Sequence, residues 1–118
     1  MFDDVLKRVL DRVDGAGCVL LASRDGMVVA SAVRPGGASA ELVAAGMADL
    51  FRKTVGALRD AELGAARELT AGGGDGHVAL REVIPGYLLA VSLAPGGSLG
   101  RARYELRKAA SLLEPELA

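Results

Sequence analysis

The residue types best suited to catalysis or metal binding are few in this sequence and stand far apart. The single cysteine, Cys18, lies within an apolar run, and the single histidine, His77, follows a glycine-rich segment. A metal site needs several ligands together, and a thiol nucleophile needs a base beside it. Cys18 is therefore predicted to be a buried core thiol, and His77 is expected to ligate nothing. Asp25 and Asp75 adjoin glycines and are interpreted as turn residues rather than a carboxylate pair.

Two glycine-rich segments invite comparison with phosphate-binding loops. The segment 72–76 precedes a predicted strand and lacks the Lys-Ser or Lys-Thr pair of a P-loop, so a turn is the preferred interpretation. Gly96, Gly97 and Ser98 precede a predicted helix whose first N–H groups are suited to an anion, but ordinary helix capping explains the same residues. No catalytic, metal or cofactor site is predicted, and the chain is expected not to be an enzyme.

Composition excludes several classes of partner. The 118 residues include 14 Lys and Arg against 15 Asp and Glu, and only 3% are aromatic, which disfavours nucleic-acid binding. No apolar run approaches the roughly 20 residues that span a membrane, and the start Met1-Phe2-Asp3-Asp4 is unlike a basic signal peptide. One cysteine excludes an internal disulfide and suits a reducing compartment. We expect one domain over 1–118, located in the cytoplasm, with neither nucleic acid nor membrane as partner.

Hydrophobic periodicity and turn residues predict the elements that hold these residues. Ser39 is a good N-cap for the longest helix, and Pro115 is expected to end the last one. Arg24-Asp25-Gly26 contains the Asp-Gly pair of tight hairpins, in which both central residues have positive φ. The expected elements are a helix over 2–14, strands over 18–23 and 27–34, a long helix over 39–63, strands over 66–71, 77–84 and 87–94, and a helix from Ser98 to about Leu113.

This order predicts an α+β fold, in which helices sandwich a five-stranded antiparallel sheet. Because the strands are rich in Val and Leu, one helical layer must cover each face of the sheet. The long helix itself has one continuous apolar face and a less ordinary opposite face. Its apolar face consists of Ala40, Val43, Ala44, Met47, Phe51, Val55 and Leu58. Its opposite face consists of Leu42, Ala45, Gly46, Asp49, Arg52, Lys53, Gly56, Asp60 and Leu63, flanked by Leu50 and Ala57.

Two glycines on the second face point to a close neighbour. Each glycine inside a helix costs about 1 kcal/mol relative to alanine, so Gly46 and Gly56 indicate that another backbone approaches there. An alternative is that they reflect only a composition rich in alanine and glycine. On the first interpretation, the long helix is covered twice, once by its own fold and once by a partner.

The chain resembles the roadblock/dynein-light-chain family. The resemblance rests on the helix and strand order α-β-β-α-β-β-β-α, shared with the roadblock/profilin-like fold, and on the hairpin at 24–26. It also rests on the long second helix, the run GYLLAV over 86–91, and the segments 99–101 and 104–110. It implies a dimer whose third strands pair into one continuous sheet, with the long helices side by side. Among bacterial members, MglB-type regulators act as dimers that reposition the switch residues of a Ras-like GTPase and insert no catalytic group.

The resemblance also implies interface residues. The third strand and the long helix would supply the dimer positions Leu42, Ala45, Gly46, Asp49, Lys53, Gly56, Arg67, Glu68, Leu69 and Thr70. The charged residues of the long helix are the candidates for GTPase docking, namely Asp49, Arg52, Lys53, Arg59 and Asp60.

Three functions therefore compete. The first is a non-enzymatic, dimeric regulator or scaffold that binds a small Ras-like GTPase, with activation of GTP hydrolysis as one form of that regulation. The second is a sensor of small molecules, which would need an apolar pocket with a few convergent polar groups. The third is a structural assembly module with no link to a GTPase. Whether the dimer is formed with an identical or a related subunit is left open by the sequence.

Overall fold

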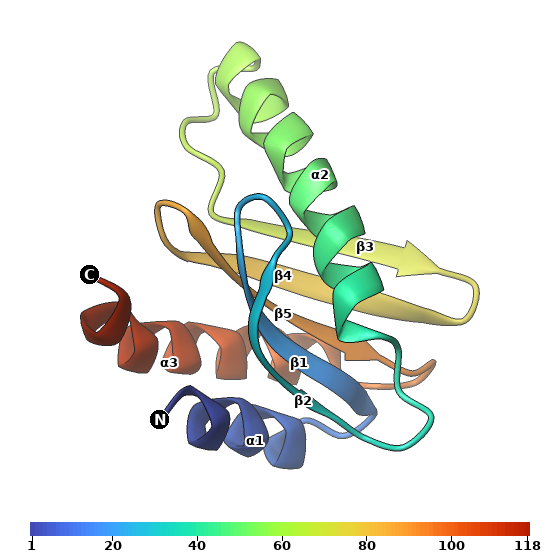
Figure 1. Cartoon of the computed structure of the whole chain (residues 1–118). Coiled ribbons are helices and arrows are strands. Elements are labelled where there is room, and N and C mark those ends of the chain that lie inside the picture. The colour runs from blue at the N-terminus through green and yellow to red at the C-terminus, as the bar shows by residue number, and fades with distance from the viewer.

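The computed structural model describes residues 1–118 and contains three helices and five strands (Figure 1). In chain order the elements are α1 (Phe2–Arg12), β1 (Ala16–Ser23), β2 (Val28–Val33), α2 (Ala40–Asp60), β3 (Glu68–Gly73), β4 (Gly76–Ile84), β5 (Tyr87–Leu93) and α3 (Leu99–Leu117).

The strands form one antiparallel sheet in the order β2-β1-β5-β4-β3. Helices α1 and α3 lie side by side on one face of this sheet, and α2 crosses the other face (Figure 1). The predicted α+β fold and its helical layer on each face are therefore confirmed. The strands β2 and β3 occupy the two edges, so β3 is hydrogen-bonded on one side only.

The face under α1 and α3 carries a closed core. Alternate residues of the central strand β5, such as Leu89 and Val91, point to this side and are completely buried. They join Leu6 of α1 and Leu106 of α3 in a cluster of 16 buried residues. The inward residues of the alternating strand and the apolar residues of α1 and α3 therefore pack into one continuous core.

The face under α2 carries a smaller cluster of 12 buried residues. Phe51 of α2 is its largest member and is completely buried, and Cys18 and Leu88 contribute from the sheet. Helix α2 packs mainly on β1, β2 and β5, and its C-terminal half extends past the sheet (Figure 1). The outer strands β4 and β3 therefore receive little cover on this face.

Several boundaries differ from the sequence prediction. Strand β3 was expected over 66–71 but spans Glu68–Gly73, and the run 72–76 is not wholly a turn. Gly72 pairs with His77 and Gly73 with Gly76, so that only the two residues 74 and 75 form the turn. Glycine was interpreted as a sign of a loop, but backbone pairing needs no side chain, and the hairpin extends through it.

The first hairpin also turns differently from the prediction. Gly26 has φ 88°, but Asp25 has no positive φ, so the two-residue turn expected from the Asp-Gly pair is absent. Instead, the Gly26 N–H donates to the Ser23 carbonyl, and Ser23 N–H donates to the Met27 carbonyl. This pattern is a three-residue loop that ends in a left-handed glycine.

Both long helices end at other residues than expected. Helix α2 ends at Asp60 rather than Leu63, because Glu62 adopts φ 59° and the Leu63 N–H donates back to the Leu58 carbonyl. This is the reversal of a Schellman motif, here without glycine at the left-handed position. Helix α3 was expected to stop near Leu113 but continues through Pro115, and its extension places Leu117 against the core under α1 and α3.

Candidate functional site

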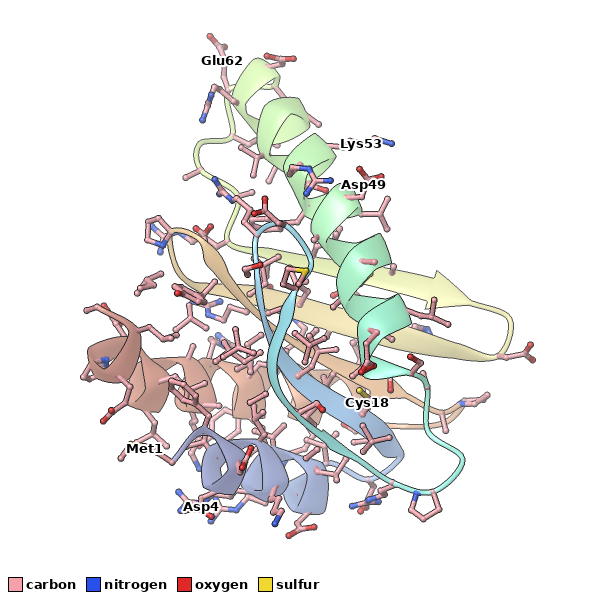
Figure 2. The ribbon with its side chains drawn as sticks, in the orientation of Figure 1. Met1, Asp4, Cys18, Asp49, Lys53 and Glu62 are labelled. Atoms are coloured by element: carbon pink, nitrogen blue, oxygen red, sulfur yellow. The ribbon has the colours of Figure 1, made fainter.

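The outer face of α2 is the first part of the candidate surface. Six of the predicted interface residues recur every three or four positions and therefore lie on one side of the helix. This exposed stripe consists of Leu42, Ala45, Gly46, Asp49, Lys53 and Gly56, all of which are exposed. Figure 2 shows Asp49 and Lys53 projecting outward from α2, whereas Cys18 lies on the sheet.

Apolar and glycine residues distinguish this stripe from an ordinary solvated helix face. Leu42 is 77% exposed, Leu63 is 71% exposed, and Leu50 on the flank is 44% exposed. A Cβ atom added at Gly46 or Gly56 would find no heavy atom within 4 Å apart from the backbone of its own helical turns and its two chain neighbours. Nothing inside the chain therefore uses the room that these glycines leave.

The charged residues on α2 fall into two groups. The Asp49 carboxylate lies 3.4 Å from Lys53 Nζ and 3.1 Å from Arg52 Nη2, and Lys53, with the help of Arg52, holds the pKa of Asp49 below its ordinary value. Arg52 also donates a 3.0 Å hydrogen bond to the Arg24 carbonyl of the first hairpin. Arg59 and Asp60 at the end of α2 are exposed and form no ion pair within the chain.

The free edge of β3 is the second part of the candidate surface. The Glu82 N–H of β4 donates to the Arg67 carbonyl, and the register continues through Leu69 opposite Leu80. Since bonding alternates along an antiparallel pair, the odd-numbered residues of β3 point their backbone groups at β4. The N–H and C=O groups of Glu68, Thr70 and Gly72 therefore point away from the sheet.

The side chains of β3 divide between the two faces. Leu69 and Ala71 are half-buried and pack on the cluster under α2. Glu68 points to the other face, where its carboxylate accepts from Arg81 at 3.0 Å and from Arg103 of α3. The hydrogen bond from Arg103 is the main reason why the pKa of Glu68 lies below its ordinary value. Of the interface residues predicted for the third strand, Thr70 of β3 is exposed, and so is Arg67, which lies just before the strand begins.

Arg24 makes contacts across the fold that no local sequence pattern predicts. Arg24 forms a 2.9 Å ion pair with Glu82 and lies 6.0 Å above the centre of the Phe51 ring. With the bond from Arg52, this arginine ties the first hairpin to both α2 and β4. Residues 24 and 82 are too far apart in sequence for any local pattern to have paired them.

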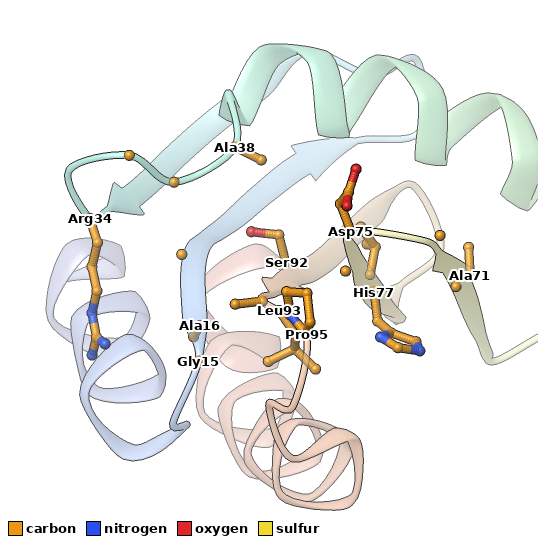
Figure 3. Close-up of a pocket in the computed structure, with 18 of the residues that line it drawn as sticks. Gly15, Ala16, Arg34, Ala38, Ala71, Asp75, His77, Ser92, Leu93 and Pro95 are labelled. Atoms are coloured by element: carbon orange, nitrogen blue, oxygen red, sulfur yellow. The ribbon is translucent and has the colours of Figure 1, made fainter.

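A broad cleft of about 900 Å³ opens at the glycine-rich end of the sheet (Figure 3). Its charged residues do not converge, because Arg34 donates to the Leu10 carbonyl of α1, and Asp75 and His77 point in different directions (Figure 3).

The single cysteine, Cys18, is completely buried, and burial raises the pKa of its thiol. The prediction of a core thiol is thus confirmed.

No group of three or more His, Cys, Asp or Glu side chains lies close enough to hold a metal ion. No helix combines the length and the apolarity that crossing a lipid bilayer requires. Ser98 caps α3 by accepting from the Arg101 N–H at 3.1 Å, so the segment considered for anion binding serves at least as a helix cap.

Solved structures similar to this chain show the same fold. A Roadblock/LC7 domain from Streptomyces avermitilis has a TM-score of 0.87 at 22% identity, covering 98% of this chain and 96% of that one. The gliding protein MglB from Thermus thermophilus has a TM-score of 0.85 at 21% identity, covering 98% and 88%. MglC from Myxococcus xanthus has a TM-score of 0.67 at 27% identity, covering 96% of each chain. No curated protein matches the sequence significantly.

The similar structures show the fold, and a match to a family model shows the family. The model of the Roadblock/LC7 domain matches residues 1–93, which include α1, α2 and the whole five-stranded sheet. The structural neighbours add the last helix to the same arrangement. The resemblance inferred from the sequence is therefore confirmed, and this chain belongs to the Roadblock/LC7 domain family.

Proposed function

We propose that this chain is a dimeric, non-enzymatic regulator or scaffold that binds a small Ras-like GTPase in the cytoplasm. The observation that carries the proposal is the exposed stripe of α2, in which Leu42 is bare to solvent and no other element of the chain approaches Gly46 or Gly56. The family membership supports the link to a GTPase, because regulation of GTPases by dimers is what the sequence resemblance implied. The similarity to MglB and MglC agrees with this direction.

A dimer through β3 would use both parts of the candidate surface. Strand β2 at the other edge packs against α1 and α2, whereas β3 packs extensively only against β4. The outward backbone groups of Glu68, Thr70 and Gly72 permit a two-fold antiparallel pairing in which Thr70 lies opposite its own copy. The same two-fold axis would bring the exposed stripes of two α2 helices together, and Gly46 and Gly56 would let them approach closely.

The charged residues of α2 are then the proposed docking site for the GTPase. Asp49, Arg52 and Lys53 already neutralise one another, so they contribute mainly shape and orientation. Arg59 and Asp60 form no ion pair within the chain and are exposed, and they are the stronger candidates for contacts with a partner. Two copies in a dimer would present two such ends of α2 to one GTPase.

The dimer is tested with the double substitution Leu69→Asp and Gly46→Arg. It introduces a charge under the paired strands and a long side chain between the helices, so light scattering at micromolar concentration is expected to give the mass of a monomer. The matched control carries Leu112→Asp and Gly100→Arg on α3, where Leu112 is 51% exposed and Gly100 has no neighbour within 4 Å. The control is expected to remain dimeric. A monomeric unmodified protein would contradict the proposal.

The GTPase link is tested by measuring GTP hydrolysis by the Ras-like GTPase encoded nearest to this gene, with and without the protein. The charge exchange Arg59→Glu with Asp60→Arg keeps the net charge and should reduce complex formation on gel filtration at least several-fold. A tethering scaffold would form the complex without changing the rate. If the protein forms no complex with that GTPase and does not change its rate of hydrolysis, regulation of that GTPase is excluded. The proposed dimer would then remain as a structural assembly module.

A sensor of small molecules is the second candidate, and the cleft of about 900 Å³ is the observation in its favour. Ligand pockets of this size are mostly apolar with a few polar groups that converge on the ligand. Here the lining is rich in glycine and the polar side chains diverge (Figure 3). A thermal-shift screen that found a stabilising metabolite, with loss of the effect in Ser92→Val, would favour this function over the first.

A further inference from the structure

The seam between α1 and α3 holds more positive charge than its own carboxylate uses. Glu105 is only 2% exposed and faces Arg12 at 3.8 Å, Arg101 at 3.4 Å and Lys108 at 3.9 Å. These distances exceed the roughly 2.8 Å of a charge-assisted hydrogen bond, and Glu105 Oε2 has no hydrogen-bond partner. The three cations therefore balance the buried charge while keeping their N–H donors free for another anion.

These cations are accessible from outside. The side chains of Arg12, Arg101 and Lys108 are 45%, 51% and 45% exposed. A shallow recess of about 20 Å³ lies between the helices and is lined by Arg8, Arg12 and Lys108 and by Leu112, which is 51% exposed. The seam thus presents four cationic groups and an apolar side chain around one buried carboxylate.

Tyr104 holds two of the cations in place. Arg101 lies 5.7 Å and Lys108 lies 5.4 Å from the centre of its ring, on the neighbouring turns of α3. Cation–π contacts of this kind restrict the two long side chains, so that less conformational entropy is lost when they bind an anion. The ring itself is 49% exposed and offers an apolar surface next to the charges.

We propose that this seam docks an acidic segment of a partner protein. Carboxylates of the segment would bind Arg8, Arg12, Arg101 and Lys108, since a guanidinium can bind a carboxylate with two parallel hydrogen bonds. An apolar residue of the segment would pack on Leu112 and the Tyr104 ring. The seam lies on the opposite face of the sheet from α2, so the interaction is independent of the dimer and of GTPase docking.

Neighbouring carboxylates favour a narrow chain over a broad anionic surface. Asp4 and Asp11 lie within one turn of Arg8 on α1, and Glu114 and Glu116 follow Leu112 on α3, all of them exposed. A membrane surface or a nucleic-acid backbone would meet these like charges, which would repel it. A single extended segment in the seam contacts the cations and leaves the flanking carboxylates in water.

The test uses the full chain and a short fluorescein-labelled peptide of Glu and Asp residues around a central Leu, followed by fluorescence anisotropy. The pair Arg101→Glu and Lys108→Glu should weaken binding roughly tenfold or more. The control pair Lys7→Glu and Arg107→Glu makes the same change of net charge on the same two-helix layer, but neither residue lines the recess or pairs with Glu105. It should weaken binding no more than about twofold.

A second variant guards against loss of the fold, because Arg101 and Lys108 also balance the buried Glu105. Arg8→Glu leaves those three cations in place and should still weaken peptide binding several-fold with an unchanged thermal midpoint. Equal weakening by the two charge-reversal pairs would overturn the proposal in favour of a non-specific effect of net charge. Binding to phosphatidylserine vesicles without binding to the peptide, or no binding to either, would overturn it as well.

Discussion

The two faces of the sheet are built from the same strands but are completed to different degrees. On one face, α1 and α3 together close a core of 16 buried residues. On the other face, α2 and the sheet form a core of 12 buried residues, and Leu69, Ala71 and Val78 remain only partly buried. The incomplete cover lies on β3 and β4, next to the edge where β3 has no neighbour.

This coincidence is informative, because a free edge and an uncovered apolar strand are each costly in water. A second copy of the chain placed beside β3 would remove both costs at once. The face under α1 and α3 has neither a free strand edge nor an uncovered apolar strand. Its outer surface is instead marked by the cations around Glu105. We therefore propose self-association at the face under α2 and binding of acidic segments at the face under α1 and α3.

The largest effect is expected on the closed face. Leu106 is 1% exposed in the core under α1 and α3, so Leu106→Ala should lower the free energy of unfolding by about 2–5 kcal/mol. This loss should not depend on protein concentration, because the core is internal to one chain. Urea unfolding would measure it, with Leu112→Ala as a control on the same helix that changes stability by about 0.5 kcal/mol or less. Equal losses in the two variants would show that α3 is not the lid of this core.

Concentration dependence is expected from the open face. If two copies meet at β3, each tenfold rise in protein concentration should add about 1.4 kcal/mol to the apparent stability of the unmodified protein. In Leu69→Asp this dependence should vanish. Urea midpoints measured over a hundredfold range of concentration would show it, and an unmodified protein with a constant midpoint would remove the distinction between the faces.

The helix caps give a smaller and more selective effect. Ser39 accepts from the Leu42 N–H at 3.4 Å, and Ser98 accepts from the Arg101 N–H at 3.1 Å. Replacing either serine by alanine should cost about 1 kcal/mol of stability. Only Ser39→Ala should also weaken the dimer, since α2 and not α3 would lie in the interface. Sedimentation equilibrium of both variants would separate the two effects, and equal weakening of association would contradict the assignment.

The smallest effect concerns Glu68, which ties β3 to Arg103 of α3. Its folded pKa lies below the ordinary value of 4.5, so its contribution to stability is present above that pH and is lost as pH falls through the folded pKa. Since the pair is partly exposed, the contribution should be about 0.5–1 kcal/mol at neutral pH. Glu68→Gln should therefore flatten the acid limb of the stability profile, measured by urea unfolding between neutral pH and pH of about 3. An unchanged profile would show that Arg103 does not hold this strand.

Much of the fold was predictable because it depends on local signals. Helical and alternating periods gave the order of elements, and the polar hydroxyl of Ser39 marked the start of α2. Where local signals failed, a distant contact decided. The pattern stopped α3 at Pro115, but the core holds Leu117, and glycines suggested a loop where backbone pairing extends β3.

The candidate surface was predictable as a stripe but not in its electrostatics. Spacing along one helix placed Leu42, Gly46 and Gly56 on one side, and that side is exposed as expected. Arg52 also bonds the Arg24 carbonyl of the first hairpin, and Glu68 bonds Arg103 of α3, and only the folded chain brings these groups together. The same holds for the three cations around Glu105, since Arg12 comes from the other end of the sequence.

The C-terminal half of α2 extends past the sheet and is held mainly at its N-terminal end. After Phe51 no residue of α2 is buried, so the last turns are held by a Schellman cap and by two half-buried contacts at Val55 and Leu58. Gly56 lowers the helix propensity in the middle of this stretch. Amide protons there should therefore exchange through local fraying rather than global unfolding. A partner bound at the C-terminal end of α2 would therefore order these turns. The ordered length of the helix would then report whether the partner is bound.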